Sequence, residues 1–305
     1  MVQGLPALDG IRVSGVLRDT ASRSRPAPQW RRTGLKLLRN RSLVIGGVIV
    51  LIMVVCALFA PWLSPYDPSL QDTDHTLAAP SAKFLLGTDM FGRDQLSRII
   101  FGTRLSFEVS LVAVSIALLL GTFLGLMAAT TRGWVDNLLM RLMDVLFAFP
   151  FLLLVLAIMA AFGTTLLNAM IAIGIVYTPS FARVARASAL SVMEQGYIEA
   201  SQGLGAKKSR IVLRHVLPNI RGPMIIQTTL SLAFAILAEA ALSFLGLGAQ
   251  PPTPSWGLML NEGRDFFTQA SWLAIFPGAA ITLAVLGFNL LGDGLRDVLD
   301  PRLQS

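Results

Sequence analysis

The sequence predicts an all-α polytopic membrane protein. Of its 305 residues, 54% are hydrophobic and only 14% are charged, whereas soluble domains carry about 25% charged residues. Uncharged apolar stretches of about 20 residues, the length that crosses a bilayer, recur along the chain. The formal net charge of +7 does not indicate nucleic-acid binding. The basic residues lie mainly in loops on one predicted side of the membrane, and this placement accounts for the positive charge.

Six apolar segments are predicted to be transmembrane helices. They are Leu43–Trp62, Ser106–Ala129, Val145–Phe162, Leu167–Ala182, Met224–Gly248 and Trp272–Leu291. The fourth is short but carries no charge. The first exceeds the apolar core of a signal peptide, about 7–15 residues, so we expect a retained anchor. Prolines within the segments do not exclude helices, because neighbouring helices can satisfy the freed backbone groups.

The basic residues predict that both termini lie in the cytoplasm. With that orientation the inner segments hold 20 of the 25 Lys and Arg residues, and the outer loops hold five. This bias follows the positive-inside rule. The predicted organisation is a cytoplasmic tail (1–42), a first span with its outer loop (43–104) and a five-helix core (105–305). Within the tail, Gln29–Asn40 fits either a helix on an anionic membrane surface or a plain basic flank.

The cytoplasmic loop 183–223 has the pattern of two short helices that meet at a glycine. Gly205 is the residue type that ends helices in the left-handed conformation, and Pro218 is expected to end the second helix. Each helix has one face at helical spacing: Tyr197, Ala200, Ser201 and Leu204, then Lys208, Ile211, Val212 and His215. These residues alone fit either a knob for a soluble partner or a hairpin on lipid headgroups.

The same loop resembles the EAA loop of the membrane subunits of ABC importers. Glu199-Ala200-Ser201, Gly205 and His215–Pro218 keep the full spacing of that motif, although Ser201 replaces an Ala and His215 replaces an Ile. The resemblance implies a coupling helix that inserts into a groove of an ATPase subunit. The implied contact residues are Tyr197, Glu199, Ala200, Ser201, Leu204, Gly205, Ile211, His215, Leu217 and Pro218.

Three further stretches resemble the peptide/nickel group of these permeases. Residues 86–98 read LGTDMFGRDQLSR, residues 244–257 read FLGLGAQPPTPSWG and residues 289–297 read NLLGDGLRD. Together they are typical of the C-type permease of dipeptide, oligopeptide, glutathione or nickel importers, which implies a type I ABC importer permease fold. From the residues alone, 86–98 predicts a turn and a short interfacial helix ending at Gly102, and 249–257 predicts a Pro-rich outer turn.

Polar residues inside the predicted spans are candidates for the translocation path. Glu239 lies deep in the fifth span, where a carboxylate costs about 2.5–3.5 kcal/mol on insertion scales. It is therefore expected either to line a cavity or gate, or to contact a partner permease. Asn289 in the sixth span is a weaker candidate, because an interhelical hydrogen bond is the favoured explanation of its side chain. Arg141 and Asp144 are expected to pair with each other.

The sequence contains no catalytic or nucleotide-binding motif. The phosphate-loop pattern G-x-x-x-x-G-K-[ST] does not occur, and Gly203–Ser209 lacks its spacing. The single cysteine and two distant histidines form no metal site. The chain is therefore expected to be neither an enzyme nor a cofactor-binding protein.

The resemblance implies a place in the bacterial cytoplasmic (inner) membrane and a set of partners. These are a second, homologous permease that completes a heterodimer, two ATP-binding subunits that carry ATP and Mg, and an extracytoplasmic substrate-binding protein. Short peptides are the expected substrate, with glutathione or nickel as alternatives. An ion-coupled secondary transporter is a remote alternative, because it would need ion-coordinating carboxylates and broken helices in both halves.

Overall fold

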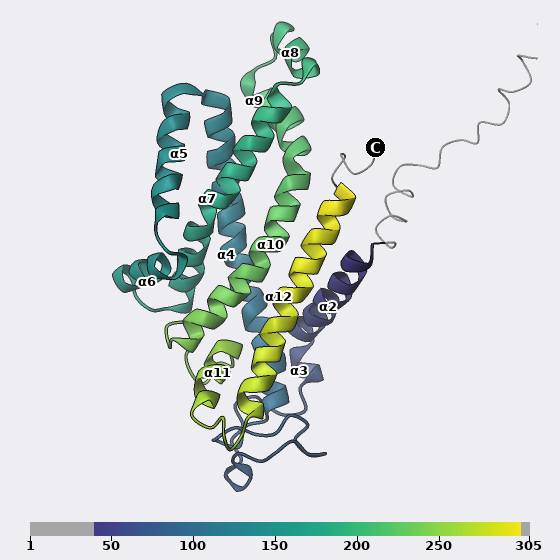
Figure 1. The fold of residues 1–305 in the computed structure, drawn as a ribbon, viewed down its shortest axis with the longest axis vertical. Helices are drawn as coiled ribbons and strands as arrows, with labels where there is room; N and C mark the ends of the chain where they lie inside the picture. The colour runs from purple at the N-terminus through teal and green to yellow at the C-terminus, as the bar shows by residue number, and fades with distance from the viewer. Residues whose placement is uncertain (1–39, 300–305) are drawn as a thin grey trace, which may run out of the picture.

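The computed structural model describes residues 40–299, and the predictions for residues 1–39 lie outside that range. The long helices run side by side along one axis (Figure 1). They are α2 (Arg41–Leu58), α4 (Gln95–Thr131), α5 (Gly133–Ala148), α7 (Leu166–Met193), α10 (Leu217–Phe244) and α12 (Trp272–Leu299). The shorter ones are α3 (Ala60–Leu63), η1 (Thr73–His75), α6 (Phe151–Phe162), α8 (Gly196–Gly203), α9 (Lys208–Ile211), η2 (Val212–Val216) and α11 (Trp256–Arg264).

Within residues 40–299, five helices are long and apolar enough to cross a membrane, and α5 with α6 makes a sixth span if the bent pair counts as one. Large apolar side chains such as Leu51, Leu119 and Leu283 are exposed on these helices, as lipid-facing residues are. The described part of the chain contains no β-strand. The predicted all-α, multi-pass class is therefore confirmed.

The third predicted span, Val145–Phe162, is wrong as a continuous helix. The α5 helix begins at Gly133 and ends at Ala148, and α6 leaves it at an angle of 97° after Phe149 and Pro150. Proline lacks the amide hydrogen that would continue α5, and its ring disfavours a helical conformation at Phe149. The break explains why an uninterrupted apolar stretch of sequence does not form one rod.

The fourth and fifth spans are longer than predicted and take in most of the cytoplasmic loop. The α7 helix continues past Pro179 to Met193. The second predicted loop helix is the start of a run from Lys208 to Phe244, which includes the π turn η2. The expectation that Pro218 ends this helix is wrong. Pro218 lies in the first turn of α10, directly after the π turn η2, and the helix continues through it.

The α4 helix is also longer than predicted, because it begins at Gln95 and passes through Gly102 without ending. A Cβ on Gly102 would lie 2.8 Å from Cδ1 of Trp256, so this glycine makes room for an indole instead of ending a helix. Gly121 and Gly125 lie where an added Cβ would overlap Phe181 and Ala182 of α7. The two glycines, spaced as GxxxG, therefore let α4 and α7 approach closely.

Ion pairs fasten α5 to α7 near the end that carries α8. Arg186 donates two hydrogen bonds to Asp136, each 2.6 Å long. Arg183 donates to Asp144 over 2.7 Å, so the expected pairing of Arg141 with Asp144 is wrong. The two arginines lie in the part of α7 that the sequence analysis assigned to the loop.

The start of α2 and the end of α12 both point toward the end of the molecule that carries the α8–α9 segment (Figure 1). The loop between α3 and α4 lies at the opposite end with α11. This arrangement agrees with an orientation in which the start of α2, the end of α12 and the loop after α7 face one side of the membrane.

Candidate functional site

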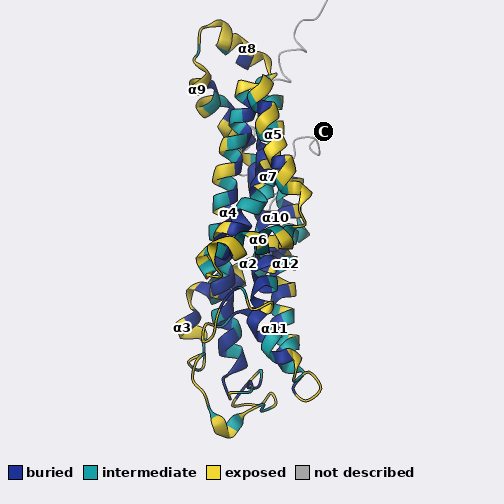
Figure 2. Ribbon diagram, turned by 90° about the vertical axis from the view of Figure 1, so that its left-hand side faces the viewer, coloured by how far each residue is buried: buried dark blue, intermediate teal, exposed yellow. Residues whose placement is uncertain are grey.

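The segment from Gly196 to Ile211, named here the α8–α9 knob, stands beyond the ends of α7 and α10 (Figure 1). Most of its surface is exposed (Figure 2). Two long helices carry it, one on each side. The sequence analysis placed a knob in this segment, and the structure places it at the tip of the helix bundle.

Buried apolar side chains hold the knob onto the bundle. Ile198, Ile211 and Val216 are buried and belong to the main hydrophobic cluster, together with Ala189 and Ile220. Ile211 was predicted as a partner contact. At 3% exposure it anchors the knob instead, because its side chain turns toward the bundle.

The remaining predicted contact residues lie at or near the surface. Leu204 is 90% exposed and Tyr197 is 48% exposed. Ser201 and His215 are half-buried, and five further residues are exposed: Glu199, Ala200, Gly205, Leu217 and Pro218. The tip of the knob therefore presents an apolar leucine to solvent, and Lys207 and Lys208 follow it along the chain.

Gly205 ends α8 with a φ of +80°, as the sequence predicted. The amide of Gly205 donates to the carbonyl of Gln202 over 2.9 Å, and the amide of Ala206 donates to the carbonyl of Ser201 over 3.1 Å. This pair of bonds is the Schellman motif that closes a helix end. Nothing lies within 4 Å of the position of an added Cβ, so only the backbone conformation demands glycine here.

A small polar contact joins α8 to the start of α10. The amide group of Asn219 donates to the Tyr197 hydroxyl over 3.3 Å and to the carbonyl of His215 over 2.6 Å. The rings of Tyr197 and His215 lie edge to face with 6.1 Å between their centroids. The knob is therefore fixed to η2 and α10 as well as to the apolar core.

Glu239 is 2% exposed, and three serine hydroxyls surround its carboxylate. Ser243 and Ser255 donate to Oε1 over 2.8 Å each, and Ser106 donates to Oε2 over 2.9 Å. Both earlier interpretations placed Glu239 on a cavity or on a partner, but its hydrogen bonds lie within this chain. It joins α4, α10 and the residue before α11.

Asn289 lies half-buried on α12. Within residues 40–299 no hydrogen bond links it to Glu239. Glu239 and Asn289 therefore do not bond to each other, and their assignment to a path stays a prediction.

A cavity that was not predicted from the sequence lies between α5, α6, α7 and α10. Its lining includes Tyr177, Ser180, Gln227 and Ser231. Gln227 and Ser231 are polar residues one helical turn apart within an apolar span, and that spacing is a signal in the sequence. The cavity itself was not predictable, because it depends on the break between α5 and α6.

Comparisons with known proteins agree on one family. Residues 117–305 match the family described as "Binding-protein-dependent transport system inner membrane component", and residues 28–80 match the "N-terminal TM domain of oligopeptide transport permease C". The fold resembles the inward-facing MetNI methionine ABC transporter, with a TM-score of 0.55 and 18% identity over 67% of this chain and 97% of that chain.

Several curated relatives match nearly the full chain. The dipeptide transport system permease protein DppC of Alkalihalophilus pseudofirmus is 45% identical over 90% of this chain and 91% of its own. The di/tripeptide permease DppC of Pseudomonas aeruginosa is 48% identical over 87% and 90%. The glutathione permease GsiD of Pectobacterium atrosepticum is 43% identical over 95% of each. The chain therefore belongs to the family of binding-protein-dependent transport system inner membrane components, the permease subunits of ABC importers.

Proposed function

We propose that this chain is the permease subunit of an ATP-driven importer that carries short peptides across the bacterial inner membrane. Relatives named as dipeptide and di/tripeptide permeases, 45% and 48% identical over most of the chain, support the substrate class. In this proposal the chain itself catalyses no reaction. ATP and Mg are bound, and ATP is hydrolysed, by separate partner subunits.

The proposed assembly contains a second, homologous permease, two ATP-binding subunits and an extracytoplasmic binding protein. The match to permease C of oligopeptide transport supports a heterodimer, because a permease designated C implies a different companion. The family description names a binding protein, which supports external delivery of the substrate.

The α8–α9 knob carries the proposal for the ATPase contact. Its tip presents Leu204 and Tyr197, while Ile198 and Ile211 fix its base to the bundle. An exposed leucine on a rigid support is a feature of a helix that docks its apolar side chains in a groove. The proposed contact residues are the exposed ones of the knob together with His215, Leu217 and Pro218, and Ile211 is their support.

Glutathione is the second candidate substrate, because GsiD, a glutathione permease, is 43% identical over 95% of this chain. Glutathione is itself a short peptide, so one path can serve both. The binding protein is expected to decide between them.

Uptake by the complete complex in proteoliposomes tests the proposal. Radiolabelled dialanine should accumulate only when ATP and the binding protein are supplied, and unlabelled glutathione in excess should reveal whether it competes. Uptake by this chain without ATP-binding subunits would overturn the proposal. So would a complete complex that hydrolyses ATP without moving either peptide.

A further inference from the structure

A cavity of about 550 Å³ lies against the break between α5 and α6. Its walls come from α5, α6, α7 and α10, and α6 lies partway between the two ends of the bundle (Figure 1). Phe149 and Phe234 line it and are 54% and 53% exposed. The cavity is therefore open at its rim and not sealed in the core.

The backbone around this cavity carries polar groups without helical partners. The last carbonyls of α5 have no following turn to accept from, because the helix stops before Pro150. Pro179 removes the amide hydrogen that would bind the carbonyl of Ile175 in α7. At membrane depth, such groups are tolerated only where protein covers them or water fills a cavity.

Polar side chains add to these groups. The side-chain amide of Gln227 donates to the Ser231 hydroxyl over 3.2 Å. Among the described residues, the Gln227 side-chain oxygen and the hydroxyls of Ser180 and Tyr177 make no hydrogen bond. These groups line one cavity and are therefore available to a ligand.

The kind of occupant follows from this lining. Lipid chains would leave the amide, the hydroxyls and the broken backbone unpaired. A tightly packed helix would favour small residues at the contact, whereas the wall here carries bulky side chains such as Phe149, Phe151 and Phe234. Apolar and aromatic walls with a few convergent polar groups are typical of ligand sites.

We propose that this cavity is the wall along which a short peptide passes, with Gln227 and Ser180 as hydrogen-bonding contacts for its main chain. The inference rests on the proposed function. The described lining residues carry no charge. The peptide is therefore held weakly, as passage requires, because a substrate held too firmly does not leave.

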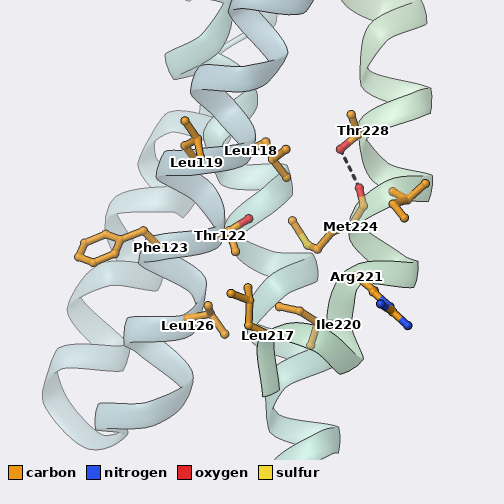
Figure 3. A pocket seen from close by; sticks show the side chains of 11 residues that line it. Leu118, Leu119, Thr122, Phe123, Leu126, Leu217, Ile220, Arg221, Met224 and Thr228 are labelled. Carbon is orange, nitrogen blue, oxygen red and sulfur yellow. Dashed lines mark hydrogen bonds between the residues drawn. The ribbon is translucent and has the colours of Figure 1, made fainter. Parts of the chain in front are cut away.

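A second groove on the other side of α10 provides a contrast. It lies between α4 and α10 and is lined mostly by apolar side chains, including Leu118, Phe123 and Met224 (Figure 3). The hydroxyl of Thr228 faces it but donates to the carbonyl of Met224 in its own helix over 2.8 Å. Thr122 and Arg221 also line this groove. The Thr228 hydroxyl is already bonded within its own helix, so Thr228 serves as a control position.

Gln227 and Thr228 are neighbours on α10 but line different cavities, so one serves as the test position and the other as its control. In the complete complex in proteoliposomes, Gln227→Leu should reduce ATP-dependent dialanine uptake about tenfold, the effect of removing one hydrogen bond made during passage. Thr228→Val in the other groove should leave uptake near that of the wild type. Equal uptake for wild type, Gln227→Leu and Thr228→Val would overturn the inference. Failure of the wild type itself would count against the proposed function instead.

Thiol labelling gives a second test that does not depend on Gln227. The only native cysteine, Cys56, is first replaced by serine. In the assembled complex, Ser180→Cys should react with a small water-soluble methanethiosulfonate reagent, and bound ATP should change the rate. Reaction in at least one state supports a wet path. A thiol that stays unreactive in every state would show a dry contact with lipid or a partner helix, and would refute the inference.

Discussion

The side-chain amide of Gln95 donates a hydrogen bond to the main-chain carbonyl of Leu273 over 3.3 Å, and this is the carbonyl that Pro277 leaves without its helical donor. A defect in α12 is thus repaired by the first residue of α4. Nearby, the indole of Trp272 donates to the carbonyl of Thr88 over 3.2 Å. The outer loop, α4 and α12 are therefore joined through main-chain groups.

Buried charges strengthen the same junction. Asp89 accepts from Arg93 over 2.6 Å and from Arg98 over 2.7 Å, and Glu262 of α11 accepts from both arginines over 3.2 and 2.9 Å. The two acidic and two basic groups balance one another. The cluster therefore gives Asp89, Arg93 and Arg98 a structural role. Asp94, the remaining charged residue of 86–98, caps α4 by accepting hydrogen bonds from Ser97.

Asp89→Asn should destabilise the purified complex, because two buried arginines would share one carboxylate. Breaking a buried pair costs about 3–5 kcal/mol. Asp265→Asn is the control, since its pair with Arg264 is exposed and is worth about 0–1 kcal/mol. Thermal unfolding should show a clear drop in Tm for the first variant only. Equal Tm values would contradict the role given to the cluster.

Gly205→Val should weaken coupling, because a residue other than glycine in the left-handed conformation costs about 1–2 kcal/mol and a branched side chain fits it poorly. Gly205→Asn should be tolerated, since asparagine adopts this conformation more readily. Both side chains would enter open space, so the comparison isolates the backbone. The measurement is transport and recovery of ATP-binding subunits on purification. Normal coupling in Gly205→Val would show that the left-handed conformation at position 205 does not require glycine.

Leu204→Asp should leave the permease folded but release the ATP-binding subunits. Burying a leucine in a groove is worth about 1.5–3 kcal/mol, so binding should weaken at least about tenfold. Leu70→Asp is the control, because Leu70 is also exposed but lies in the loop at the opposite end of the molecule. Affinity purification of each variant, followed by quantification of the partner subunits, gives the answer. Full recovery with Leu204→Asp would exclude the knob tip as the contact.

Glu239→Leu should reduce the yield of folded complex, because three serine hydroxyls would lose their acceptor in a dry interior, at about 1–3 kcal/mol for each unpaired group. Glu239→Gln should assemble better, since its amide still bonds to hydroxyls. Measurements of complex yield and peptide uptake distinguish a structural role of Glu239 from a role as a gate. Normal yield of both variants with altered uptake would favour the gate interpretation over the polar junction seen here.

Single cysteines test the orientation in intact cells after replacement of Cys56 by serine. Asp74→Cys should react with a membrane-impermeant maleimide added outside, whereas Lys208→Cys should react only after the membrane is opened. Both residues are exposed, so access depends only on the side of the membrane. Reaction of position 208 from outside would invert the proposed topology and separate the knob from the cytoplasm.

Local patterns in the sequence predicted a large part of this structure. Apolar length found the spans, and Gly205 was correctly assigned to a left-handed helix end. The start of α5 was missed because its polar residues, such as Asp136, are paired with α7. Gly102 was misread as a helix end, because the Trp256 that fills its space is distant in the sequence.

The environment of Glu239 was also beyond local reasoning. Its three serine partners come from α4, α10 and the loop before α11. Nothing near Glu239 in the sequence identifies Ser106 or Ser255 as its donors. Contacts between distant segments decide whether a buried carboxylate is a gate or a junction, and these contacts appear only in the folded chain.

The continuous run from Lys208 to Phe244 has a mechanical consequence. An α-helix barely stretches. A straight helix would therefore pass an axial displacement at the knob on to Gln227, roughly 28 Å further along. Bending is easier at the π turn of η2 and at Pro223, and both lie between the knob and Gln227. Bending at η2 and Pro223 would convert part of an axial displacement of the knob into a lateral displacement of the cavity wall. Substitutions that stiffen these two positions should therefore change how far the wall moves, although they alter neither the knob nor the cavity.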